Sequence, residues 1–130
     1  MRLRISNVDG VPIYQQIINQ VRHLIAAGRL LPGEELLPIR LLAEQLTVNP
    51  NTVARAYLEL ERAGIVTKRH GSGTYVSEKA PVLNHREKLR ELQQRVDPLL
   101  VEAAHLNVDL DDVLELVRER YSLIHSGIIK

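Results

Sequence analysis

The chain has 130 residues and no cysteine, which suits one ordinary domain or a small domain with an appendage and excludes disulfides, thiolate zinc sites and thiol catalysis. Residues 1–79 carry ten Lys or Arg and seven Asp or Glu, whereas residues 80–130 carry seven and nine, a weak indication that the first part binds nucleic acid. No apolar run is long enough for a signal peptide or a membrane span, so we expect a cytoplasmic protein without a membrane partner.

The first predicted helix runs from Pro12 to Ala27. Its apolar residues recur at spacings of three and four, which is the buried stripe of an amphipathic helix. Pro12 suits the first helical turn, and Gly28 suits the left-handed position just past the end. Pro32-Gly33 then indicates a loop. The apolar stripe consists of Ile13, Ile17, Val21 and Leu24.

A second helix is predicted over residues 39–46 and a third from Pro50 to Ala63. Asn49 can cap the third helix, and Pro50 occupies the first helical position, where no N–H is needed. Only residues 47–49 separate the two helices. Two short helices joined by three or four residues are typical of a helix-turn-helix.

A β-hairpin is predicted after the third helix, with strands over residues 65–69 and 73–77 and a tip at His70-Gly71-Ser72. We expect Val66 and Tyr75, together with Thr74, to pack one face of the hairpin against the helices. Three helices followed by a hairpin form a winged helix. The expected fold class is therefore mainly α with a small β-hairpin, a winged helix-turn-helix followed by a two-helix tail.

The boundary between the two parts is expected at Ala80-Pro81. This gives a DNA-binding domain over residues 1–79 and a helical dimerisation and effector tail over residues 80–130. Pro98 interrupts the first helix of the tail, and it should either kink this helix or start a new one capped by Asp97. Asp109 is the expected cap of the last helix.

An apolar seam along the tail predicts a homodimer, because an isolated two-helix unit buries little surface. A two-fold protein also matches an inverted repeat whose half-sites lie about one helical turn apart. The alternative is that the seam folds back on the last helix of the same chain. The expected dimerisation residues are Leu89, Leu92, Val96, Leu99, Ala103, Val113, Val117 and Tyr121.

The start of the third helix is where contacts to bases are expected. In a helix-turn-helix, the N-terminal residues of the second helix of the motif reach base edges in the major groove. Apolar residues take the inward positions, which leaves Asn51, Thr52 and Arg55 on or near the outward face. Asn and Arg have bidentate geometry for adenine and guanine. Alternatively, Asn51 and Thr52 only help to cap the helix, and Arg55 pairs with Glu59.

The tip of the hairpin supplies a second basic surface. Lys68 and Arg69 carry permanent charges beside His70, Gly71 and Ser72. Small residues let the backbone approach a phosphate or enter a narrow groove, where a neighbouring cation gains from the potential of the minor groove. The alternative is an ordinary solvated turn, in which glycine is present only because the turn needs its backbone dihedral angles.

An ordered series of motifs runs through residues 11–77: PIYQQI, a G-x-L-x-P-G turn, an Arg before LLA, NPNTVARAY, LE-x-x-G and GSGTYV. Together these motifs resemble the DNA-binding domain of the GntR family. Only residues 80–130 follow, which is similar to the YtrA subfamily, in which a short two-helix tail serves dimerisation. We therefore do not expect the larger ligand-binding domains of the other subfamilies.

The resemblance implies a dimeric transcription regulator, usually a repressor, and often of operons that encode ABC transporters. Here the operon would be the protein's own or a nearby one. The family usually has Leu-Pro-Ser-x-Arg before the second helix, whereas Pro38 replaces that Ser here, so the hydroxyl that would cap the helix and touch phosphate is missing. The DNA contacts that the resemblance implies come from Arg40, Thr52, Arg55, His70 and Gly71.

No catalytic or metal chemistry is predicted. The five histidines include no pair at the i,i+3 or i,i+4 spacing that presents two ligands on one helix face, so we expect no metal, no cofactor and no enzyme activity. Two functions are then considered. One is a dimeric repressor of double-stranded operator DNA, with an unknown small-molecule effector. The other is an interaction module whose basic face docks an acidic protein or binds DNA non-specifically. A specific to non-specific affinity ratio of about 10³ or more favours the first.

Overall fold

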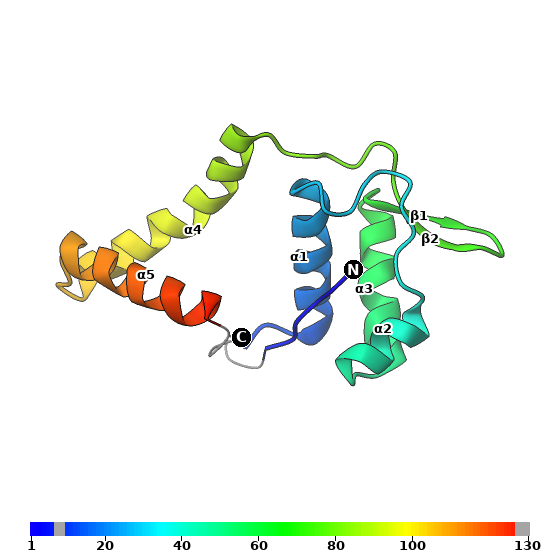
Figure 1. Cartoon of the computed structure of the whole chain (residues 1–130), viewed down its shortest axis with the longest axis horizontal. Coiled ribbons are helices and arrows are strands. Elements are labelled where there is room, and N and C mark those ends of the chain that lie inside the picture. Colours follow the sequence, from blue (N-terminus) through cyan, green and yellow to red (C-terminus); the bar gives the residue numbers. More distant parts are fainter. Residues whose placement is uncertain (7–9, 127–130) are drawn as a thin grey trace. The chain divides into compact units, whose positions relative to one another are not determined.

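The computed structural model describes residues 1–6 and 10–126, and it divides into two compact units, Met1–Leu83 and Asn84–Lys130. The first unit contains α1 (Ile13–Ala26), α2 (Ile39–Leu46), α3 (Pro50–Arg62), β1 (Val66–Arg69) and β2 (Gly73–Val76), and the second contains α4 (His85–His105) and α5 (Leu110–His125) (Figure 1). Three helices, a hairpin and two tail helices therefore follow one another in the predicted order.

The core of the first unit lies where α1 and α2 pack against α3. Its residues are aliphatic almost throughout, and they come from the inward sides of the three helices, from the segment between α1 and α2, and from the hairpin. The side chains that are most completely buried are Ile17, Val21, Ile25, Leu30, Leu36, Leu42, Val53, Leu60, Val66 and Val76.

The N-terminal segment lies along α1, an arrangement that the sequence analysis did not predict. The backbone N–H of Arg4 donates to Oε1 of Gln20 at 2.8 Å, and the N–H of Ser6 donates to Oε1 of Gln16 at 2.8 Å. Both glutamine amides also donate back to the carbonyls of the same two residues. This pairing fixes the segment so that Leu3 reaches the core.

The turn between α2 and α3 contains an unusual backbone conformation. Thr47 ends α2 with φ 55° and ψ 49°, which is the left-handed region. The N–H of Val48 then donates to the carbonyl of Ala43 at 3.0 Å and closes the turn. A β-branched residue is strained in this region, where glycine or asparagine is usual. The helix-turn-helix geometry therefore imposes this conformation against the preference of the residue.

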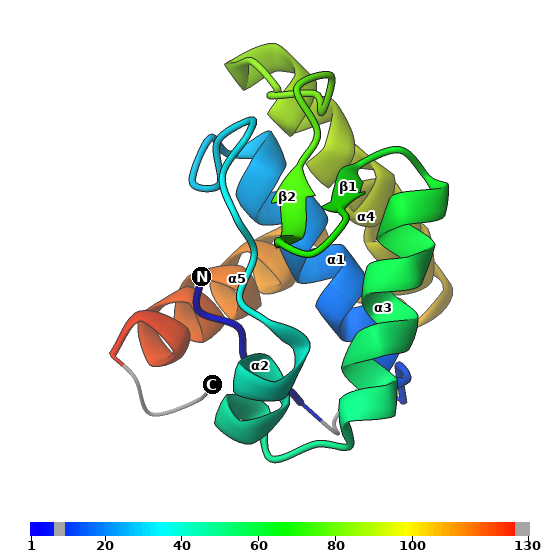
Figure 2. The ribbon, with the colours of Figure 1, turned by 90° about the vertical axis from the view of Figure 1, so that its right-hand side faces the viewer.

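The hairpin, or wing, pairs β1 with β2 antiparallel and places Val66 opposite Val76. Both valines are buried, whereas Tyr75 is paired with Thr67 on the other face of the hairpin. The expectation that Tyr75 packs inward was wrong. Alternate residues of a strand face opposite sides of the hairpin, and it is Val76 that faces the core. Figure 2 shows the first unit from the side on which the hairpin extends.

A third backbone segment extends the wing. Glu35 forms an isolated bridge with Tyr75, and the N–H of Leu36 donates to the carbonyl of Thr74 at 2.8 Å. The segment before α2 therefore lies along the outer edge of β2, a strand edge that would otherwise be open. The sequence predicts only a loop here, at Pro32-Gly33.

Residues 80–83 belong to the first unit and not to the tail. Ala80 is buried, and the N–H of Leu83 donates to the carbonyl of Ala26 at 2.9 Å, at the end of α1. The structural boundary therefore lies between Leu83 and Asn84, beyond the predicted one at Ala80-Pro81.

The tail consists of two helices with polar caps. Asn84 and Glu87 form a reciprocal capping box at the start of α4. This helix continues through Pro98, so the alternative of a new helix capped by Asp97 was wrong. The predicted cap of α5 is confirmed, because the carboxylate of Asp109 accepts the N–H of Asp112 at 3.0 Å. Within the described part of the chain, no helix is both long and apolar enough to cross a membrane.

Candidate nucleic-acid interface

Helix α3 is the second helix of the helix-turn-helix, and a cap defines where it starts. Oδ1 of Asn49 accepts the N–H of Asn51 at 2.8 Å, and Pro50 occupies the first helical position. Asn49 therefore makes the cap, and the side chain of Asn51 is exposed in the first turn. The inward side of α3 is filled by Val53, Ala56, Tyr57 and Leu60, all of which are buried.

Arg55 is exposed on α3, and its guanidinium lies over an aromatic ring. Its Cζ is 3.7 Å from the centroid of the Tyr14 ring on α1. The alternative that Arg55 pairs with Glu59 is not what the structure shows, because Oε1 of Glu59 lies 3.1 Å from Nη1 of Arg62. Arg55 is therefore held by a cation–π contact, and no carboxylate among residues 1–6 and 10–126 forms an ion pair with it.

The remaining helical residues of the predicted interface differ in exposure. Thr52 is half-buried in the first turn of α3, whereas Arg40 is exposed in the first turn of α2. Pro38 precedes α2 and offers no side-chain hydrogen bond to cap it. Arg40 is thus exposed at the start of α2. The hydroxyl that usually caps this helix in the resembled family is missing, because residue 38 is proline.

The tip of the wing is organised around Tyr75. Cζ of Arg69 lies 4.0 Å from the centroid of the Tyr75 ring, and the Tyr75 hydroxyl forms a 2.6 Å hydrogen bond with Oγ of Ser72. Gly71 adopts φ 74°, which is the left-handed conformation that a tight turn needs and that glycine reaches without steric cost. The predicted wing residues Lys68, Arg69, His70, Gly71 and Ser72 are all exposed.

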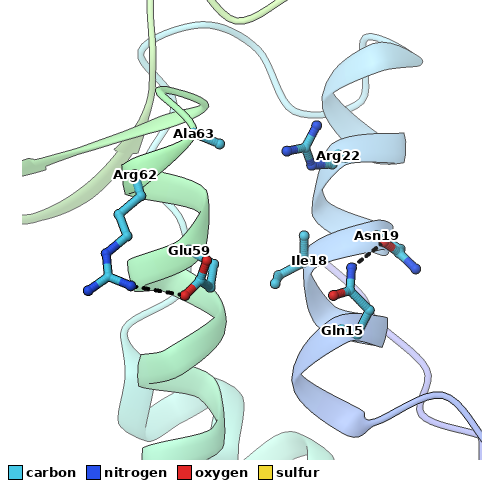
Figure 3. A pocket seen from close by; sticks show the side chains of 7 residues that line it. All are labelled: Gln15, Ile18, Asn19, Arg22, Glu59, Arg62 and Ala63. Carbon is cyan, nitrogen blue, oxygen red and sulfur yellow. Dashed lines mark hydrogen bonds and ion pairs between the residues drawn. The ribbon is translucent and has the colours of Figure 1, made fainter.

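A groove also lies between α1 and α3 (Figure 3). Gln15 donates to Asn19 at 2.9 Å along α1, and Arg62 pairs with Glu59 along α3, so these polar groups are matched within their own helices. Apolar lining comes from Ile18 together with Ala63. Ligand sites are usually lined mainly by apolar groups, and we assign no ligand to this groove.

The predicted dimerisation residues of the tail fall into two groups. Ala103 and Val113 are buried within the tail itself, close to the turn between α4 and α5. The other six side chains are each between 42% and 62% exposed. They are Leu89, Leu92, Val96 and Leu99 on α4, with Val117 and Tyr121 on α5.

Sequence reasoning missed Tyr14 and Tyr75 as neighbours of the interface. Tyr14 was read only as part of a family motif, and Tyr75 as a core residue. The sequence predicts that Arg55 and Arg69 are exposed. It does not predict the tyrosine ring under each arginine, because that ring belongs to another helix or strand. No spacing rule connects residues 14 and 55, which are brought together by the packing of α1 against α3.

Comparison with known proteins places the first unit in a described group. Residues 13–76 match the model of the bacterial regulatory proteins of the gntR family. The HTH-type transcriptional repressor YtrA of Bacillus subtilis (strain 168) is 37% identical over 125 residues, which cover 96% of each chain. This match extends through the tail as well as the winged helix.

Solved structures give the same result for the fold. A GntR family transcriptional regulator from Listeria monocytogenes matches with a TM-score of 0.62 and 32% identity, covering 85% of this chain and 96% of that one. The DNA-binding domain of AraR in complex with operator ORX1 matches with a TM-score of 0.51 and 25% identity, covering 58% of this chain and 93% of that one.

Proposed function

The chain belongs to the GntR family of bacterial regulatory proteins, and from this premise we propose that it is a cytoplasmic transcription repressor that binds an inverted-repeat operator as a homodimer. In this role it is a regulator and not an enzyme. The operon that it controls is its own or a neighbouring one, and the family resemblance favours genes of an ABC transporter.

The observation that carries DNA binding is the exposed start of α3. Asn51 and Arg55 are both exposed there, on a helix whose opposite side is buried. Asn pairs with adenine and Arg with guanine in the major groove through two hydrogen bonds each. The exposed cations of the wing add contacts to phosphate or to the minor groove, which position the domain on DNA. The AraR domain of similar fold binds operator DNA, which supports the same use of the winged helix here.

The exposed seam of the tail supports the homodimer. Apolar side chains on α4 and α5 remain accessible although Ala103 and Val113 are already buried within the tail. Large apolar side chains that remain exposed at helical spacing, such as those of α4, are expected to mark an interaction site. A second copy of the same tail would cover it and would also give the two-fold symmetry that an inverted repeat needs.

The first experiment is fluorescence anisotropy of the protein against DNA from its own upstream region and a scrambled control, over a series of salt concentrations. We expect binding to the upstream DNA to exceed binding to the control by about 10³ or more. Equal binding to both duplexes, with a steep salt dependence, would instead indicate an architectural role or a distant operator. Binding to neither duplex would instead favour the alternative that the basic face binds an acidic protein.

A further inference from the structure

Two of the three arginines of the proposed interface, Arg55 and Arg69, rest on tyrosine rings. The chain has four tyrosines, no phenylalanine and no tryptophan, and two of these four tyrosines lie under Arg55 and Arg69. In each case the ring and the guanidinium come from different elements: α1 and α3 for Tyr14 with Arg55, and β2 and β1 for Tyr75 with Arg69. An arginine that stacks on a tyrosine of another element thus occurs both in the helix-turn-helix and in the wing.

A stacked guanidinium keeps its hydrogen-bonding capacity. The ring contacts the face of the guanidinium, whereas the five N–H donors of arginine lie in its plane and point outward from its edge. A guanine base or a phosphate is bound through that edge by two parallel hydrogen bonds. Stacking on Tyr14 or Tyr75 is therefore compatible with simultaneous binding to DNA.

Stacking also restricts the arginine before DNA arrives. A free arginine side chain loses rotamer freedom when it is immobilised in an interface, and this loss reduces affinity. A side chain that is already held in place loses less. At the wing, Tyr75 restrains the tip a second time, because its hydroxyl is bonded to Ser72.

We propose that Tyr14 and Tyr75 are positioning residues, which hold Arg55 for reading bases and Arg69 for contacting the DNA backbone. This inference rests on the proposed function, and it assigns to two tyrosines a role that neither performs by touching DNA. It predicts different consequences at the two sites. Loss of the Tyr14 ring lowers the preference for operator sequence, whereas loss of the Tyr75 ring lowers affinity for all DNA.

The test uses a duplex selected by the wild-type protein from a random pool, with a scrambled duplex beside it. Exposed cation–π contacts are weak, so we expect Tyr14→Leu to reduce affinity for the selected duplex about two- to fivefold and to leave the scrambled duplex unchanged. Tyr14→Phe, which keeps the ring, should bind like wild type. Tyr75→Leu should weaken both duplexes by a similar factor. Tyr75→Phe keeps the ring but removes the bond to Ser72, so it measures the hydroxyl separately.

A double-mutant cycle separates positioning from a purely structural role. In an Arg55→Ala background, Tyr14→Leu should cause no further loss of affinity for the selected duplex. An equal loss in both backgrounds, or an equal loss on both duplexes, would overturn the assignment of Tyr14. For Tyr75, an equal loss caused by Tyr75→Leu in the wild-type and Arg69→Ala backgrounds would overturn the assignment.

NMR relaxation of the arginine Nε–H groups tests the restraint in the free protein, without a variant that could fail to fold. We expect an order parameter above about 0.6 for Arg55 and Arg69, because a flexible group falls below that value. Values below it would overturn the inference even if the wild type prefers its selected duplex. If the wild type shows no preference for any duplex, the proposed function itself fails, which is a distinguishable result.

Discussion

The phenol of Tyr57 donates a 2.7 Å hydrogen bond to the backbone carbonyl of Leu37. Tyr57 lies on the inward side of α3, and Leu37 lies just before α2, so this bond joins the two helices of the helix-turn-helix across twenty residues of sequence. Burial raises the pKa of the Tyr57 phenol above its ordinary value of 10.0, because the charged phenolate would be poorly solvated.

We expect Tyr57→Phe to lower the free energy of unfolding by about 1 kcal/mol at pH 7, because the ring remains but the carbonyl of Leu37 loses its partner. Urea unfolding measures the change. Tyr14→Phe is the matched control and should have little effect, because it keeps the ring and the Tyr14 hydroxyl forms no hydrogen bond within the described residues. A Tyr57→Phe protein as stable as wild type would show that water satisfies the carbonyl equally well.

The same pair of proteins gives a pH dependence with a definite sign. The raised pKa of Tyr57 favours the neutral phenol in the folded state, so its contribution to stability is fully present below pH 10 and is lost as the pH rises further. The advantage of wild type over Tyr57→Phe should therefore shrink above pH 10. A stability difference that stays constant between pH 9 and about pH 11 would contradict the buried, neutral state of this phenol.

We predict that Arg55→Ala weakens binding to the operator and relaxes base preference, because Arg55 would read a base edge. Arg69→Ala should instead weaken binding to every sequence and reduce the slope of log affinity against log salt by about one. Anisotropy titrations on specific and random duplexes measure both effects. Arg62→Ala is the control on α3, since Arg62 is already paired with Glu59. Equal losses on both duplexes for Arg55→Ala would exclude base reading by this residue.

The double variant Leu92→Asp with Val96→Asp should be monomeric and should bind DNA poorly, because charges would be placed in the apolar seam of α4. Both side chains are exposed in the single chain, so we expect its helical content to persist. Sedimentation velocity gives the oligomeric state, and Gln94→Asp provides a control at a polar position of the same helix. If the double variant is still a dimer, the dimer interface lies on another surface.

Thr47→Gly should stabilise the protein by about 0.5–1 kcal/mol. The left-handed conformation costs an L-residue roughly 1–2 kcal/mol, and this relief exceeds the entropic cost of glycine, roughly 0.5–1 kcal/mol. Thr67→Gly, in an exposed strand position with ordinary backbone geometry, is the control and should be destabilising. Chemical denaturation of the two variants checks the sign, and a loss of stability in Thr47→Gly would mean that its side chain makes a compensating contact.

Local sequence signals specify the helices of the winged helix-turn-helix. The expected bounds of α2 agree with the structure, and α3 begins at Pro50 behind an Asn49 cap as predicted. These features are local, because a cap, a proline at the first turn and an apolar stripe act within a few residues of chain. The family motifs are local in the same sense, and they are sufficient to predict the class of regulator.

Tertiary structure decided what depends on residues far apart in sequence. Alternation along the strand allows Tyr75 to lie on either face of the hairpin. Val76 is the residue that faces the core, because it pairs with the buried Val66. The placement of Arg55 over Tyr14 and the pairing of Gln20 with Arg4 follow from which helix packs beside which segment. Such contacts are selected by the summed burial and hydrogen bonding of the whole unit, and no short window of sequence contains both partners.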